Sequence, residues 1–323
     1  MKPYTIMEVC GTHTHAIAKA GIKQLLPDNV RLISGPGCPV CVTPNAAIDE
    51  MIALTEHAIV CTFGDMVRVP GSRTSLEACN NVKVVYSPMD AVEIARANPD
   101  KQVVFLGVGF ETTAPTTAVA IMNAPHNFSV YCAHKNMPHA LETIVNDDEV
   151  KVDGLLLPGH VSTIIGTSPY EFLARDYGVS GVVSGFKPED IMLAIDMLLK
   201  CKSEIKIAYT SGVKPEGNPT AVNLINQVFN TCDSEWRGLG IISHSGYKIK
   251  DEYSAYDAKL KFDIKIEPPI EHKSCKCGEV LRGKISPEVC PLFAKTCTPQ
   301  SPVGPCMVSN EGTCSASYQN PKI

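Results

Sequence analysis

The chain has 323 residues, of which 44% are hydrophobic and 20% are charged, a composition typical of globular proteins with a substantial core. A net charge of −5 at pH 7 and the absence of a basic run argue against a nucleic-acid partner. The apolar runs are too short to span a bilayer, and the N-terminal residues do not read as a secretory signal peptide. We therefore expect a cytoplasmic protein without membrane association.

Short β-rich runs alternate with stretches of helical spacing along most of the chain. The expected strands are 31–34, 58–63, 82–86, 103–107, 128–133, 154–157, 181–184 and 206–209. The expected helices lie between many of them, at 45–57, 91–97, 115–122, 138–145 and 189–200. This alternation predicts an α/β protein built from βαβ units with parallel sheets.

Eight strands suit two small α/β domains better than one sheet. We place a first α/β domain at 1–88, a second at 89–250 and a loop-rich, cysteine-rich module at 251–323. The last segment loses the periodicity of the rest and carries six of the 14 cysteines. The two α/β domains are expected to face a cleft.

Two motifs near the N-terminus combine thiols with other potential metal ligands. The segment CGTHTHAI offers Cys10, His13 and His15, although Thr12 or Thr14 capping a helix is the simpler interpretation of that stretch. The segment GPGCPVC follows an expected strand, and its prolines and glycines predict a stiff loop for Cys38 and Cys41. Loops after neighbouring parallel strands gather at one sheet edge, so these thiols are candidates to meet Cys10 there.

The C-terminal segment has the spacing C-x14-C-x6-C-x16-C, with two further cysteines left over. Many cysteines at short spacing in a reducing compartment favour metal binding or catalytic thiols over structural disulfides. A zinc ribbon would have two close C-x2-C pairs, which this segment lacks, so an iron–sulfur cluster is favoured. A zinc site and a disulfide-held tail remain alternatives, and spacing does not select four ligands from six.

Three further motifs carry weaker signals. GFETTAPTTA follows a strand and opens a helix, where free amides can hold an anion, or where Thr112 or Thr113 simply caps the helix. LPGHVST presents His160 after another strand, most simply as a structural group, and FGDMVRVPGS contains an acidic and a basic residue that suit a surface ion pair. The isolated cysteines are expected to be small buried residues, namely Cys61, Cys79, Cys132, Cys201 and Cys232.

These motifs, taken in order, resemble those of the HypD family of hydrogenase maturation factors over roughly residues 7–318. The resemblance implies a role in assembling an iron atom that carries cyanide and carbon monoxide, destined for nickel–iron hydrogenases. It also implies a small HypC-type chaperone as partner and a HypE-type protein as the cyanide donor.

The resemblance further assigns roles to individual residues. The iron unit would be held at a site with Cys10, His13, Cys38 and Cys41. The C-terminal module is similar to the cluster region of ferredoxin:thioredoxin reductase, which implies a 4Fe-4S cluster on Cys275, Cys290, Cys297 and Cys314. The same likeness implies a redox disulfide between Cys277 and Cys306, and makes Glu111 and Thr112 candidate residues of the cleft.

Two classes of function remain open. One is a redox-active assembly scaffold that shares its catalysis with partner proteins. The other is a stand-alone, cluster-dependent thiol–disulfide reductase, in which Cys38 and Cys41 reduce a substrate disulfide. The CGTHTH segment favours the scaffold, because a third cysteine with an adjacent histidine suits a metal cradle better than a reductase face.

Overall fold

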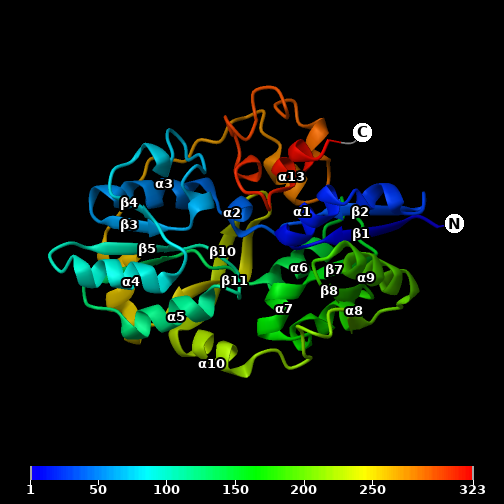
Figure 1. Ribbon diagram of the computed structural model, residues 1–323, viewed down its shortest axis with the longest axis horizontal. Helices are drawn as coiled ribbons and strands as arrows, with labels where there is room; N and C mark the ends of the chain where they lie inside the picture. Colours follow the sequence, from blue (N-terminus) through cyan, green and yellow to red (C-terminus); the bar gives the residue numbers. More distant parts are fainter. Residues whose placement is uncertain (1, 322–323) are drawn as a thin grey trace. The chain divides into compact units, whose positions relative to one another are not determined.

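The computed structural model describes residues 2–321 and divides the chain into two compact units (Figure 1). Unit 1 contains the residues up to Val42, Met137–Pro219 and the residues from Ser274 onward, whereas unit 2 contains Thr43–Asn136 and Thr220–Lys273. This division differs from the three consecutive segments expected from the sequence, because a strand from the N-terminal segment pairs with one from the middle of the chain. The α/β class with parallel sheets is confirmed.

Unit 1 is built on a five-stranded sheet of order β2-β1-β7-β8-β9, in which every pair is parallel. Its strands are β1 (Tyr4–Glu8), β2 (Val30–Ser34), β7 (Gly154–Pro158), β8 (Ser180–Ser184) and β9 (Ile205–Ile207). Its α-helices are α1 (Gly11–Lys19), α2 (Pro39–Val42), α6 (Met137–Val145), α7 (Gly159–Ile165), α8 (Glu171–Tyr177), α9 (Pro188–Lys200), α12 (Cys277–Leu281) and α13 (Thr313–Gln319). Its 3-10 helices are η1 (Ile22–Leu25), η5 (Ser168–Tyr170), η7 (Pro287–Val289) and η8 (Pro305–Met307).

Burial explains why the central strands of unit 1 read as continuous apolar runs. All five residues of β7 are buried, and so are those of β8, as expected for parallel strands covered on both faces. One side of the sheet packs against α1 and α9 through a cluster that includes Ile6, Ile17 and Leu198. Strand β1 was not expected from the sequence, because its five residues alternate too briefly to give a clear period.

The cysteine-rich segment packs onto the other elements of unit 1. Helix α13 packs against α1, and η8 packs against α2. The guanidinium of Arg282 donates to the carboxylate of Asp147 at 2.5 Å and to that of Glu149 at 2.9 Å, which links this segment to the turn after α6. The helices of this segment span seven residues at most, in agreement with the expected loop-rich module.

Unit 2 is built on a four-stranded parallel sheet of order β4-β3-β5-β6 and an antiparallel hairpin. Its strands are β3 (Ile59–Thr62), β4 (Val82–Val84), β5 (Val103–Gly107), β6 (Phe128–Cys132), β10 (Phe229–Trp236) and β11 (Gly240–Ile249). Its α-helices are α3 (Asn45–Ala53), α4 (Pro88–Ala97), α5 (Ala114–Asn123), α10 (Pro219–Val228) and α11 (Ala258–Lys261). Its 3-10 helices are η2 (Leu54–Glu56), η3 (Gly64–Met66), η4 (Leu76–Ala78) and η6 (Asp251–Tyr256).

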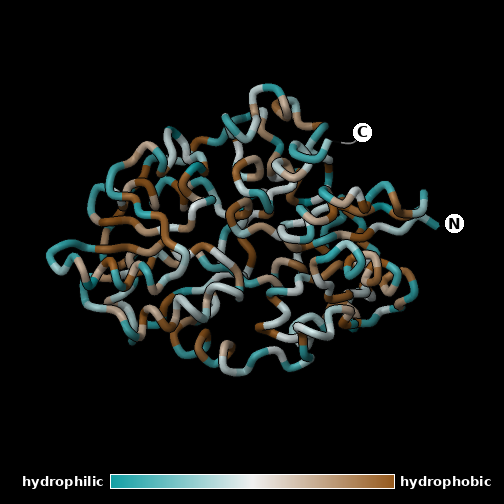
Figure 2. Tube along the Cα trace, viewed as in Figure 1, coloured by the Kyte–Doolittle hydropathy of each residue, from teal (hydrophilic) through white to brown (hydrophobic). Residues whose placement is uncertain are grey.

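Hydropathy follows the sheet in unit 2, since Figure 2 shows hydrophobic colouring along the central strands and hydrophilic colouring on the surrounding loops. Strands β5 and β6 are buried at every position. The hairpin β10–β11 was not expected from the sequence, because exposed polar residues occupy much of both strands. Within residues 2–321, no helix has the length and apolar character needed to cross a lipid bilayer.

Candidate functional site

The carboxyl edge of the unit 1 sheet has the geometry of a binding site. The chain runs from β1 to β2 on one side and from β7 to β8 on the other, so the direction of the connections reverses between β1 and β7. Ligands of open α/β sheets bind at such a reversal, beyond the carboxyl ends of the strands. Cys10 follows β1, the GPGCPVC loop follows β2, and His160 follows β7, so three of the sequence motifs meet this edge.

Cys38 and Cys41 form a disulfide across the short helix α2. Their Cα atoms are 5.3 Å apart, and both residues are buried. Pro39 opens the helix, where its missing N–H costs no hydrogen bond and its fixed φ suits the helical turn. The stiff loop therefore holds both sulfurs at bonding distance in unit 1.

Glycine 37 brings this loop against the CGTH segment. A methyl group at Gly37 would lie 2.2 Å from the backbone nitrogen of Cys10, too close for a non-bonded contact. The backbone N–H of Gly11 donates to the carbonyl oxygen of Gly37 at 2.9 Å, which ties the two loops together. The expected proximity of Cys10 to the Cys38–Cys41 loop thus follows from backbone contacts.

Cys10 occupies the N-cap position of α1, so the expected cap by Thr12 or Thr14 is wrong. Thr14 lies inside the helix, and its hydroxyl donates to a carboxylate oxygen of Glu8 at 2.6 Å. Burial, together with the nearby carboxylates of Glu311 and Glu8, raises the pKa of the Cys10 thiol to about 12. Without a cation the group is a thiol, and a bound metal ion would favour its thiolate.

Two glutamates that sequence reasoning missed lie beside Cys10. Glu8 is fully buried, accepts the backbone N–H of Cys10 at 3.1 Å, and has its pKa raised to about 7 chiefly by burial. Glu311 accepts the hydroxyl of Thr12 at 2.7 Å, and its side chain lies against Gly11. Glu8 sits in an apolar strand and Glu311 in a loop, so neither had a motif that pointed to this site.

His13 of the CGTHTH motif and His160 of the LPGHVST motif both contact the ring of Phe186. The His13 ring centroid lies 5.2 Å from that of Phe186, and the His160 ring stacks on the same ring at 3.9 Å. Nε2 of His13 lies 2.9 Å from the carbonyl oxygen of Gly185, so Nε2 carries the hydrogen and Nδ1 has no hydrogen-bond partner among the described residues. Burial lowers the pKa of His13 to about 4, which keeps its Nδ1 lone pair available at neutral pH.

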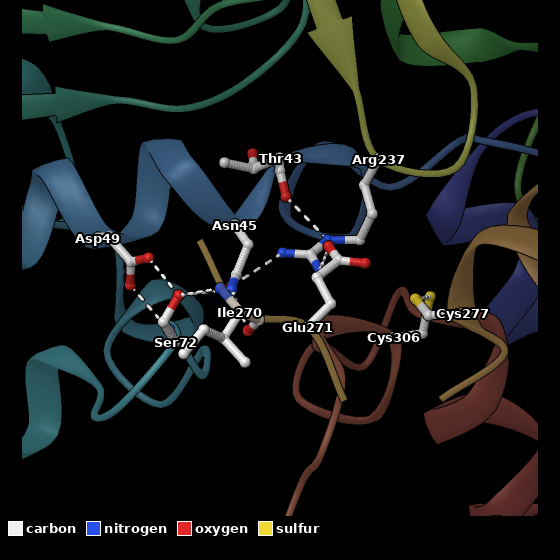
Figure 3. Close-up of polar contacts among 9 residues, drawn as sticks. All are labelled: Thr43, Asn45, Asp49, Ser72, Arg237, Ile270, Glu271, Cys277 and Cys306. Carbon is white, nitrogen blue, oxygen red and sulfur yellow. Dashed lines mark hydrogen bonds and ion pairs between the residues drawn. The ribbon is translucent and has the colours of Figure 1, made fainter. Parts of the chain in front are cut away.

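Cys277 and Cys306 form the second close pair of sulfurs in unit 1. Their Sγ atoms are 2.9 Å apart and hydrogen-bonded, and both residues are buried (Figure 3). Cys277 begins α12, whereas Cys306 belongs to η8, the element that packs against the disulfide-bearing helix α2. The pair is held as two thiols at a separation from which a disulfide can form.

The other four cysteines of the C-terminal segment are suitable for a 4Fe-4S cluster. They lie near one another or near the Cys277–Cys306 pair, within one small segment of unit 1. These four are Cys275, Cys290, Cys297 and Cys314. Within residues 2–321, no three His, Cys, Asp or Glu side chains converge on one point where a single metal ion would sit. A cubane takes one thiolate at each iron, so its ligands surround a volume and need no common point. Four thiols in one small segment are the type and number of donors that such a cluster takes.

Glu111 and Thr112 belong to unit 2, whereas all the thiols described above belong to unit 1. The unit 2 connections also reverse direction, between β3 and β5, and GFETTAPTTA follows β5 there. Glu111 is 1% exposed, and Thr113 occupies the N-cap position without a side-chain cap bond. The placement of Glu111 and Thr112 in a cleft with the thiols stays a prediction.

The remaining expectations concern single residues. Arg68 of the FGDMVRVPGS motif pairs with Glu77 at 3.8 Å on the surface of unit 2. Of the isolated cysteines, Cys61 and Cys132 are buried as expected. Three others are half-buried, contrary to expectation: Cys79, Cys201 and Cys232.

A polar network in unit 2 was not expected from the sequence (Figure 3). The buried guanidinium of Arg237 donates to the carbonyl oxygen of Thr43 at 3.0 Å and to the carboxylate of Glu271 at 2.6 Å. The amide of Asn45 donates to the carbonyl oxygen of Ile270 at 2.8 Å. These bonds fix the extended segment that precedes the cysteine-rich region and the residue that follows α2.

Comparison with known proteins agrees with these motifs. The HypD family model, described as "Hydrogenase formation hypA family", matches residues 1–321. The chain is 44% identical over 338 residues to hydrogenase maturation factor HypD of Cupriavidus necator, covering 98% of this chain and 89% of that protein. It is 44% identical over 333 residues to the factor of the same name from Escherichia coli, with the same coverage. The chain therefore belongs to the HypD family.

Proposed function

We propose that this protein acts in hydrogenase maturation as a redox-active scaffold, on which an iron atom receives cyanide and carbon monoxide. The observation that carries the proposal is the Cys38–Cys41 disulfide, tied by Gly37 to the Cys10 loop. The names of its relatives support the maturation role. The working partners would be a small HypC-type chaperone and a HypE-type cyanide donor, in the cytoplasm.

The iron unit is the cargo in this proposal, and Cys10, Cys38 and Cys41 are its candidate ligands. Thiolates are strong ligands for iron, but the two disulfide sulfurs bind it only after reduction. Reduction adds two electrons and two protons, breaks the S–S bond and leaves two thiols.

The electrons for this reduction would come from Cys277 and Cys306. A thiolate of this pair attacks one sulfur of the Cys38–Cys41 disulfide, and the mixed disulfide is then resolved by the second thiol. One disulfide is broken and one is formed, so atoms and electrons balance. The packing of η8 on α2 favours this exchange, because Cys306 and Cys41 lie on those two elements.

Reduction of the Cys277–Cys306 disulfide back to two thiols takes two electrons and two protons from outside the pair. A 4Fe-4S cluster would be held by Cys275, Cys290, Cys297 and Cys314, and when bound it would supply electrons to the Cys277–Cys306 disulfide. Burial keeps the pKa of Cys275 at about 12, so metal binding would have to displace its proton. In this arrangement the protein is an assembly scaffold with redox capacity, not a stand-alone enzyme.

A stand-alone thiol–disulfide reductase is the second candidate, favoured by the disulfide itself. The two are separated by an infrared spectrum of the protein, purified without oxygen from cells that co-express HypC-type and HypE-type partners. Bands of metal-bound cyanide and carbon monoxide that vanish in a Cys10→Ala variant support the scaffold. Their absence, together with intact cluster absorbance and reduction of a disulfide substrate, supports the reductase.

A further inference from the structure

Unit 2 contains a cavity of about 270 Å³ that the maturation chemistry does not use. Its walls come from the end of β6, the hairpin β10–β11 and the beginnings of α3 and α11. The lining combines Lys135, Lys248 and Lys259 with carboxylates and with two tyrosines. A concave site of this size with several converging polar groups is suited to a small organic ligand.

Lys135 is the unusual member of this lining, because it is a lysine with only 3% of its surface exposed. Its Nζ donates to the hydroxyl oxygen of Ser234 at 2.8 Å and to the carbonyl oxygen of Glu235 at 2.6 Å. A neutral amine has two hydrogens and one lone pair, and these two acceptors account for both hydrogens. In the neutral amine the lone pair therefore remains as the nucleophilic group, and Lys135 lines the cavity.

The surroundings of Lys135 make the neutral amine accessible near pH 7. Burial, together with the ammonium of Lys259, lowers the pKa of Lys135 to about 7, whereas Glu235, Cys232 and Cys132 act in the opposite direction. The Nζ atom also lies 5.2 Å from the ring centroid of Trp236, a contact that favours the ammonium form. Both forms are therefore populated at neutral pH.

We propose that Lys135 forms a reversible imine with a small carbonyl compound bound in this cavity, and that the compound carries a carboxylate. The nitrogen lone pair attacks the carbonyl carbon, the carbonyl oxygen leaves as water with two amine hydrogens, and a C=N bond forms. No electrons are gained or lost, so no redox partner is needed. Buried lysines beside a second cation are activated for such chemistry.

Two other lysines of the lining offer partners for a ligand carboxylate, beside the acidic side chains of the same lining, which are Glu50, Asp233, Glu235 and Asp257. Lys248 is exposed, and the ammonium of Lys259 lies 4.5 Å from the ring centroid of Tyr131, at the wall of the cavity. Either ammonium can pair with a ligand carboxylate while the carbonyl group faces Lys135. The inference is independent of the proposed function, since the candidate iron ligands belong to unit 1.

The test uses glyoxylate with sodium cyanoborohydride at pH 7, followed by peptide mass spectrometry of the full-length protein. Reduction turns the imine into a stable carboxymethyl-lysine, whereas adducts of the neighbouring thiols are not trapped. We expect Lys135 to be labelled at least about tenfold faster than Lys248 and Lys259.

Two variants keep the inference open to refutation. Lys135→Arg retains the cation and its donors and should abolish the fast labelling, with folding checked by circular dichroism. Lys259→Gln removes a like charge, so it should raise the pKa of Lys135 and slow its labelling several-fold at pH 7. Labelling of Lys135 no faster than that of Lys248, or fast labelling only after unfolding, would overturn the inference.

Discussion

The two parallel sheets share one strand order over four strands but carry different chemistry at their carboxyl edges. In unit 1 the reversal between β1 and β7 meets Cys10, a disulfide and two histidines. In unit 2 the reversal between β3 and β5 meets a buried glutamate and a helix N-terminus. The topology therefore determines where a site forms, and the loop residues determine what the site does.

The largest expected difference between the two units concerns iron. Cys41→Ala should abolish retention of the iron unit, because one of the two thiolates released from the disulfide is lost. The C-terminal cluster should remain, as judged by its visible absorbance. Infrared bands and iron content of the anaerobically purified protein measure the effect.

Cys132→Ala is the matched control, since Cys132 is a buried cysteine at the end of a strand in unit 2. It should leave the infrared bands unchanged. Equal loss of iron and cluster in both variants would mean that these cysteines are structural, and the contrast between the two sheet edges would then disappear.

The second contrast uses one glycine from each sheet edge. Gly37→Ala would place a methyl group 2.2 Å from the backbone of Cys10, so the loops must move apart, at a cost of about 3 kcal/mol or more in the free energy of unfolding. Gly64→Ala, after β3, meets only a side-chain carbon at 3.6 Å and should cost less than about 1 kcal/mol. Urea unfolding compares the two, and equal costs would show that the two loops of unit 1 are not in close contact.

The third contrast concerns pH and buried histidines. The pKa of His134 in unit 2 is lowered to about 4, mainly by burial, against 6.5 for an ordinary histidine. The unfolded chain therefore binds this proton first as the pH falls, and stability is lost between pH 6.5 and 4. His134→Gln should reduce the decrease in the free energy of unfolding between pH 6.5 and 4 by about 3 kcal/mol.

The pKa of His13 in unit 1 is also lowered, so His13 also lowers stability as the pH falls. The raised pKa of Glu8 has the opposite effect on the pH dependence of stability. The pKa of Glu8 is raised to about 7, so Glu8 adds stability at low pH that is lost as the pH rises from 4.5 to 7. Urea titrations between pH 4.5 and 7 should give a steeper slope for a Glu8→Gln variant than for the wild type. An unchanged slope in the His134→Gln variant would contradict the burial of that ring as a neutral group.

The smallest expected effect is the difference in stability cost between replacing Arg237 and replacing Arg73. Both side chains contact the same extended segment of unit 2, at Glu271 and Glu267. Arg237→Ala removes the hydrogen bonds that Arg237 donates to buried oxygen atoms of Thr43 and Asn45, and should cost about 2–3 kcal/mol in the free energy of unfolding. Arg73→Ala removes an ion pair with Glu267 whose side chains are 70% and 71% exposed, and should cost less than about 1 kcal/mol. Thermal unfolding measures both, and similar shifts would contradict a buried role for Arg237.

By itself the sequence determined the α/β class and the family. Local spacing predicts strands and helices because apolar residues must face a core. The order of the motifs along the chain predicts the family. The stiff GPGCPVC loop was readable in the same way, since proline and glycine restrict the backbone locally.

Only the tertiary structure decided which distant residues share a site. The pairing of β1 with β7 placed His160 near His13, and the packing of the C-terminal segment placed Glu311 beside Gly11. The spacing of apolar residues predicted neither the β10–β11 hairpin nor the burial of Lys135. Their positions depend on contacts between residues far apart in the chain, and the spacing of residues along a single segment carries no information about such contacts.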